Sequence, residues 1–344
     1  MICKNDHGCH SDPMRYHPPV RKTGVQKLAL ISIVCLIVII FAGATVRVTG
    51  SGLGCPDWPT CWGELIPPTS VDQVDPSKID IEKFRKYDER FGRDSSKTTV
   101  DSVLAKFDGT QTWIEFLNRL VALPTLLAIF LLMVACCRRP RFRKHGIIAF
   151  LVTVGNALFG IVVIKSNLHS GVVTVHMALT FALLFLLTYL LWAAGRAGEP
   201  RPSIKGTTRL QVMVLLVCVM LEWALGSQVR EMTDKLMMEN GVESRASWMT
   251  QISASWMYLI HRSFSWSILI AALWLGYRTE WKGFVPRLVL TVVGALMLMG
   301  LTLSTSGIHA VVQVLHVGLA GILVSAVFFW WLAAEPSKKG GSRA

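Results

Sequence analysis

The sequence predicts an all-α membrane protein whose eight transmembrane helices form two pseudo-symmetric four-helix bundles. Three observations support this: 52% of the 344 residues are apolar, they gather in eight long runs, and the two halves of the chain share motifs. A helix of about 20 apolar residues crosses about 30 Å of hydrocarbon. The runs lie at roughly 28–46, 114–136, 146–165, 171–193, 210–229, 256–276, 286–306 and 308–332.

These runs divide the chain into tails, two bundles and a linker. We expect a cytoplasmic tail at 1–27, an N-terminal bundle at 28–193 with an external insertion at 70–112, a cytoplasmic linker at 194–209, a C-terminal bundle at 210–332 and a cytoplasmic tail at 333–344. The length of the first run favours a retained anchor over a cleaved signal peptide. In the insertion, apolar spacing favours one or two surface helices over a disordered loop.

The net charge of +13 is a topology signal in this chain. In a soluble protein it would suggest nucleic-acid binding, but here Lys and Arg gather in three short loops, at 138–144, 196–209 and 278–287. By the positive-inside rule these loops are cytoplasmic. We therefore expect both termini in the cytoplasm of a cell-membrane protein, the long first loop on the outer face, and no nucleic-acid partner.

The two halves repeat one another. The matched stretches are GATVR (43–47) with GSQVR (226–230), W-x-x-x-x-N-R (113–119) with W-x-x-x-x-H-R (256–262), and 160–179 with 300–319 without a gap. Because each copy has an even number of spans, both copies enter the membrane from the same side. This predicts a parallel repeat about an axis along the membrane normal.

Five histidines lie within spans or near their outer ends, where a histidine is costly unless it is paired or bound. They are His169, His176, His261, His309 and His316. His261 and His316 have similar depth on two spans of one bundle, which suits a bis-histidine heme. The competing interpretation is a hydrogen bond from each imidazole to a backbone carbonyl. Zinc is disfavoured because no third ligand accompanies the pair.

The first half departs from the second at two positions. Asn118 replaces the equivalent of His261, and Glu115 replaces the equivalent of Tyr258. A carboxylate at this depth can be a general acid or base or can stabilise charge. At a helix N-terminus it can also simply favour the helix dipole.

Three further charged residues are candidates. Glu222 on span five either faces a cavity or pairs between the bundles. Arg119 and Arg262 directly follow the two ligand positions. Each arginine either reaches lipid headgroups or binds a heme propionate.

The eight cysteines fall into three groups. Cys55 and Cys61 flank PDWPT in the first outer loop, where an oxidising environment favours a disulfide over two free thiols. Cys3 and Cys9 lie in the tail CKNDHGCH, for which a solvated tail is favoured over a metal site. The remaining four are most simply apolar filler: Cys35, Cys136, Cys137 and Cys218.

The stretches VRVTGSGLGCPDWPTCWGELIPPT (46–69), WIEFLNR, LGSQVREMTD (225–234) and MYLIHRSFSW resemble the heme A synthase family over essentially the whole chain. The resemblance implies an eight-span oxidoreductase that oxidises a methyl group of heme O to the formyl of heme A for cytochrome oxidase assembly. It implies a heme b with His261 and His316 as iron ligands. It also implies a substrate heme bound by His176 in the N-terminal bundle, and an essential carboxylate at Glu115.

Two features depart from the family pattern: Asn118 stands where a histidine is usual, and the loop at 231–254 has no cysteine pair. Asparagine is a poor iron ligand, so we expect the substrate iron to have one strong axial ligand, His176. Asn118 and Arg119 would lie beside that substrate, and Arg262 beside heme b. Glu115 would stabilise charge or transfer protons during successive hydroxylations.

The expected partners follow from this chemistry. They are heme O and a farnesyltransferase that produces it, an external electron donor, the lipid bilayer and, in a homo-oligomer, further copies of the chain. One alternative is a bis-histidine b-type cytochrome for electron transfer, against which the asymmetry at Asn118 argues. Another is a non-catalytic heme-binding or transport protein, which would not need Glu115.

Overall fold

The computed structural model describes residues 23–90, 94–166, 169–195, 203–240, 245 and 247–336. Among these residues, eight helices are long and apolar enough to cross a membrane. They are α1 (Gly24–Thr49), α4 (Gly109–Cys137), α5 (Pro140–Lys165), α6 (Ser170–Ala193), α7 (Arg209–Asn240), α9 (Trp256–Arg278), α10 (Phe284–Thr305) and α11 (Ala310–Ala333). The prediction of a helical protein with eight candidate membrane spans is confirmed.

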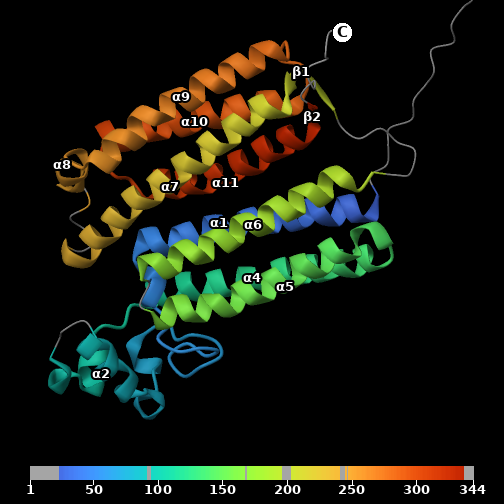
Figure 1. Ribbon diagram of the computed structural model, residues 1–344. Coiled ribbons are helices and arrows are strands. Elements are labelled where there is room, and N and C mark those ends of the chain that lie inside the picture. Colours follow the sequence, from blue (N-terminus) through green and yellow to red (C-terminus); the bar gives the residue numbers. More distant parts are fainter. Residues whose placement is uncertain are drawn as a thin grey trace, which may run out of the picture.

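The eight helices pack in two groups. In the first, α1 and α5 each contact both α4 and α6; in the second, α7 and α10 each contact both α9 and α11. It follows that α4 lies diagonally across from α6, and α9 across from α11. Figure 1 shows the two groups side by side, with α11 and α6 contacting each other between them.

Glycines bring the two groups together where α1 meets α11. A Cβ atom added to Gly318 would lie 2.1 Å from a ring carbon of Phe41, and one added to Gly321 would lie 3.2 Å from Ile40. Small residues are common at such contacts because, in lipid, close van der Waals packing drives helix association. The hydrophobic core continues through this junction with the fully buried Leu187 of α6 and Val324 of α11.

The two ends of the molecule differ. One, which we call the loop end, carries residues 51–108 and α8 (Trp248–Ser253); the opposite strand end carries β1 (Ile204–Thr208) and β2 (Ala334–Glu335) (Figure 1). The two short strands pair in parallel. This pairing joins the expected linker at 194–209 to the start of the expected C-terminal tail.

Residues 51–108 fold around a small core of their own. The segment holds α2 (Ile81–Arg90), α3 (Val100–Leu104) and the 3₁₀ turns Ser51–Leu53, Val71–Gln73, Pro76–Lys78 and Ser95–Lys97. The buried hydrophobic residues of this core are Cys55, Cys61, Trp62, Val74 and Val103. The surface helices expected in the insertion correspond to α2 and α3. The transmembrane helix that follows begins at Gly109, capped by Asp108.

Candidate functional site

His261 of α9 and His316 of α11 face each other across the second group of helices. Their ring centroids lie 6.4 Å apart and the ring planes are inclined by 78°. Nδ1 of each ring is buried without a hydrogen-bond partner among the described residues. Two half-buried imidazoles in this position can bind both axial sites of a heme iron.

A carboxylate lies behind one of these imidazoles. Oε1 of Glu222, on α7, is 3.0 Å from Nδ1 of His261, although the ring is not oriented for a hydrogen bond. A carboxylate next to a ligand imidazole orients the ring and makes it a stronger base. Glu222 therefore lies within one group of helices and beside a candidate ligand.

Glycines on the neighbouring helices make room for the imidazoles. A Cβ added to Gly226 would lie 3.2 Å from Cε1 of His261, which is tighter than ordinary van der Waals contact. A Cβ on Gly300 would lie 3.8 Å from Cε1 of His316. A glycine thus lies at each point where a histidine ring packs against the backbone of a neighbouring helix.

The first group of helices repeats one half of this arrangement. A Cβ on Gly160 would lie 3.8 Å from Cε1 of His176, the distance found for the matching pair in the second half. The ring of His176 stacks on Phe159, with centroids 6.5 Å apart, and its Nδ1 is buried without a partner in the described structure.

The other half of the arrangement is changed. Asn118 lies on α4, diagonally across from α6, and its Oδ1 is buried without a partner among the described residues. A Cβ added to Gly43 would meet nothing within 4 Å, whereas its repeat equivalent Gly226 abuts His261. The exchange of histidine for asparagine therefore leaves open space beside α1.

Glu115 is a buried and fully engaged carboxylate. It is 3% exposed, and its Oε2 accepts a hydrogen bond of 2.8 Å from the backbone N–H of Cys55. Its Oε1 lies 2.6 Å from Nη2 of Arg119, one turn further along α4. Each oxygen of Glu115 is thus in contact with a donor, one a backbone amide and the other a guanidinium.

Arg119 binds the first loop to α4. Its guanidinium donates to the carbonyl oxygens of Cys55 at 3.1 Å, Asp57 at 2.9 Å and Thr60 at 3.1 Å. Together with the ion pair to Glu115, these bonds occupy both Nη atoms of the guanidinium within the protein. The corresponding residue of the second half, Arg262, instead lies 5.9 Å above the ring of Tyr258.

The first loop is closed by the predicted disulfide. Cys55 and Cys61 are bonded, and both are fully buried. Nζ of Lys83, on α2, donates to the carbonyl oxygen of Pro56 in this loop. The disulfide loop is thus held between α4 and α2.

Other candidates lie apart from these clusters. His169 and His309 are exposed residues at matching positions, immediately before α6 and α11. The Cys3 and Cys9 tail lies outside the described residues. Free, buried or half-buried thiols are found at Cys35, Cys136, Cys137 and Cys218.

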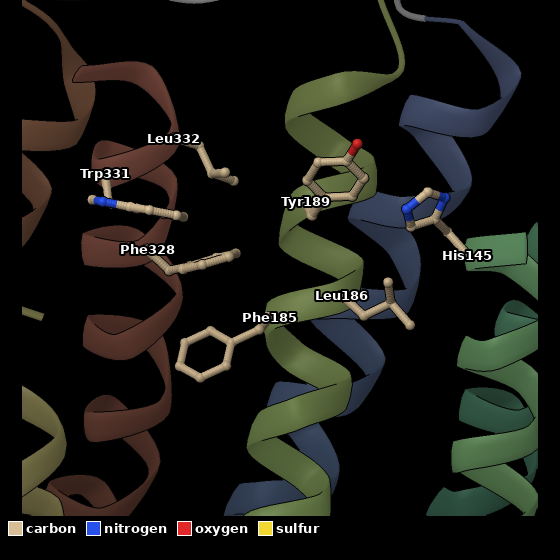
Figure 2. Close-up of a pocket in the computed structure, with 7 residues that line it drawn as sticks. All are labelled: His145, Phe185, Leu186, Tyr189, Phe328, Trp331 and Leu332. Carbon is tan, nitrogen blue, oxygen red and sulfur yellow. The ribbon is translucent and has the colours of Figure 1, made fainter. Parts of the chain in front are cut away.

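One hollow lies away from His176, His261 and His316, at the strand end of α6. It measures about 490 Å³ and is lined by His145, Phe185, Leu186, Tyr189, Phe328, Trp331 and Leu332. Figure 2 shows aromatic side chains of α6 and α11 approaching each other there. The rings of Phe185 and Phe328 are 4.6 Å apart, so this contact packs one group of helices on the other.

Sequence reasoning missed a charged cluster at the loop end. Arg230 of α7 lies 2.6 Å from Asp234, and Arg47 of α1 forms an ion pair with the same carboxylate. The repeat could have revealed this cluster, because Arg47 and Arg230 end the matched stretches GATVR and GSQVR.

Fold and site together define a multi-pass helical membrane protein with histidines directed between its helices. The chain belongs to the COX15-CtaA family, described as cytochrome oxidase assembly protein, whose model matches residues 26–328.

Curated relatives are named heme A synthase. The protein of Sphingopyxis alaskensis is 25% identical over 315 residues, covering 84% of this chain and 86% of the relative. That of Shewanella oneidensis is 25% identical over 195 residues, covering 56% and 53%. That of Listeria welshimeri is 24% identical over 213 residues, covering 59% and 57%. The chain thus spans little more than half the length of the Listeria and Shewanella relatives.

Proposed function

We propose that this protein is an oxidoreductase that converts a methyl group of heme O to the formyl group of heme A by successive hydroxylations, for cytochrome oxidase assembly. Family membership and the names of its relatives support the reaction. The observation that carries the proposal is the asymmetry between the halves. One half holds two facing imidazoles, His261 and His316, and the other keeps His176 opposite Asn118.

We propose that the two groups of helices are pseudo-symmetric four-helix bundles, at 28–193 and 210–332, related by a parallel repeat. The identical glycine–histidine distances at Gly160 and Gly300 support this relation. The loop end would face outward and the basic strand end the cytoplasm, with both termini.

The C-terminal bundle would hold heme b through His261 and His316. An iron bound at about 2 Å to one nitrogen of each ring places the ring centroids about 6 Å apart, and the observed separation is 6.4 Å. The two imidazoles thus fit this group. When bound, heme b supplies a one-electron redox centre. Glu222 would orient His261 and strengthen it as a ligand.

The N-terminal bundle would bind heme O, with His176 as its strong axial ligand. Asn118 would leave the opposite face weakly capped, and the open space beside Gly43 would admit the substrate. Glu115 would stabilise charge near the reacting edge or transfer protons during the successive hydroxylations. Arg119 would hold this carboxylate and the disulfide loop in place.

Electrons would come from an external donor, and heme O from a membrane farnesyltransferase. The proposal is tested by co-expressing the chain with a heme O source and identifying the extracted hemes by mass. We expect heme A together with heme b. Two tightly bound b hemes without heme A would instead define an electron-transfer cytochrome. Bound heme without any conversion would define a transport protein.

A further inference from the structure

Arg47 and Arg230 lie on either side of one carboxylate at the loop end. Nη2 of Arg230 is 2.6 Å from Oδ1 of Asp234, and Nη2 of Arg47 binds Oδ2. The two arginines hold matching positions in the repeat, one on α1 and one on α7. Asp234 therefore connects the two halves of the chain at a point where both contribute a cation.

A third guanidinium joins this cluster. Arg245, between α7 and α8, donates to the carbonyl oxygen of Val48 and, at 3.4 Å, to Oε1 of Gln313. The positive charges of Arg47 and Arg245 both act on Arg230. Burial lowers the pKa of Arg245, because its cation is partly desolvated.

The cluster has more positive than negative charge. Arg47 and Arg230 pair with the carboxylate of Asp234, and Arg245 lies close enough to act on Arg230, so these four described residues together have a net charge of +2. Arg230 is only 9% exposed and its guanidinium is paired with Asp234, whereas the Nε of Arg245 is buried without a hydrogen bond in the described structure. Buried cations are costly unless anions and hydrogen bonds compensate them, so this arrangement suits further anionic groups.

The cluster contacts both of the helices, α6 and α11, that carry candidate iron ligands. Nη1 of Arg47 is 3.6 Å from Sδ of Met177, the residue after His176. On the other side, Gln313, which Arg245 contacts, lies one helical turn before His316 on α11. An anion bound here would therefore lie beside the two helices, α6 and α11, that carry the candidate iron ligands His176 and His316.

We propose that Arg47, Arg230 and Arg245 form a receptor for the carboxylate groups of heme. Guanidinium groups bind carboxylates through short, charge-assisted and often bidentate hydrogen bonds. Of the arginines expected from sequence to do this, Arg119 is engaged by the first loop, and Arg262 is exposed and lies over the ring of Tyr258. The inference rests on the proposed function, since it requires heme at the histidine sites.

The test compares two ligands on the full chain purified from heme-deficient cells. Iron protoporphyrin carries two carboxylates, and its dimethyl ester carries none. We expect Arg230→Gln to weaken binding of the free acid about ten-fold, as for loss of a hydrogen bond to a charged group, and to leave ester binding unchanged. Comparing each ligand across variants cancels the stronger partition of the ester into detergent. Arg278→Gln, an exposed arginine at the strand end, is the matched control and should change neither.

Asp234→Asn should change the affinity for the free acid in the opposite direction to Arg230→Gln. It removes the internal carboxylate that competes for the guanidiniums, so the free acid should bind more tightly and the ester unchanged. If the cluster only held helices together, Asp234→Asn and Arg230→Gln would instead weaken both ligands equally, which would overturn the proposal. Because Asp234→Asn removes no cation, it carries the test even where Arg230→Gln does not fold.

Two backgrounds identify which heme supplies the carboxylate. If the effect of Arg230→Gln on the free acid disappears in His261→Ala, the carboxylate belongs to the heme of the C-terminal site. If it disappears in His176→Ala, it belongs to the substrate site. Failure of the unmodified protein to bind either ligand would contradict the proposed function itself, and equal effects on acid and ester would contradict the receptor alone.

Discussion

The carboxylate of Glu115 lies 2.6 Å from the guanidinium of Arg119, one turn away on α4. Its other oxygen accepts the backbone N–H of Cys55, whose partner in the disulfide is Cys61. Glu115, which we propose acts on the substrate, thus also links a transmembrane helix to the first loop. Changes at Glu115 have to be measured on both properties.

We expect Glu115→Gln to reduce heme A formation about a hundred-fold or more, the range for loss of a group that transfers protons. The amide can still accept the N–H of Cys55, so the fold and the heme b spectrum should persist. Mass analysis of extracted hemes and an absorption spectrum measure the two effects. Glu64→Gln, at an exposed carboxylate of the same loop segment paired with Lys78, is the control. Normal heme A in Glu115→Gln would remove its proposed role.

His261→Ala and His316→Ala should each abolish a low-spin bis-histidine spectrum, because each removes one of the two facing imidazoles. His176→Ala should leave this signal in place, since its helix belongs to the other group. Optical and electron paramagnetic resonance spectra of the purified variants are the measurement. Persistence of the signal in both alanine variants would eliminate the C-terminal heme site.

Two equivalent glycines should respond differently to the same substitution. Gly226→Ala places a Cβ 3.2 Å from Cε1 of His261, so the ring must shift and heme b affinity should fall about ten-fold. Gly43→Ala meets nothing within 4 Å and should leave heme b unaffected, although it adds a methyl group beside the proposed substrate site. Heme b content and midpoint potential in both variants check this. Equal loss of heme b in Gly226→Ala and Gly43→Ala would show that the closer packing of Gly226 against His261 does not affect heme b binding.

Asn118→His should change the spin state of bound heme O toward low spin, because a second imidazole would then lie across from His176. The Oδ1 of Asn118 is buried without a partner among the described residues, and we expect the introduced imidazole to occupy the same site. Absorption spectra of the variant loaded with heme O are compared with those of the unmodified protein. An identical spectrum would mean that position 118 does not face the iron.

The transmembrane helices and the facing histidines of this protein could be predicted from its sequence, because they depend mainly on residues close together in the chain. Eight apolar runs predict eight helices, since a backbone in lipid must satisfy its own hydrogen bonds. The repeat places His261 and His316 at similar depth, and the pair is found facing across one group of helices. The disulfide between Cys55 and Cys61, favoured from sequence because the loop was expected on an oxidising outer face, is also present.

What the sequence did not determine is which charges meet. Arg119 is committed to the carbonyl oxygens of the first loop, while Arg47 and Arg230, unremarked in sequence, converge on Asp234. Residues 47 and 234 are far apart along the chain, and whether they meet depends on how α1 packs on the second group of helices. Helix formation is dictated by local sequence, but the partner of a long, flexible arginine is selected by packing between distant helices. Only the tertiary structure could therefore assign these charges.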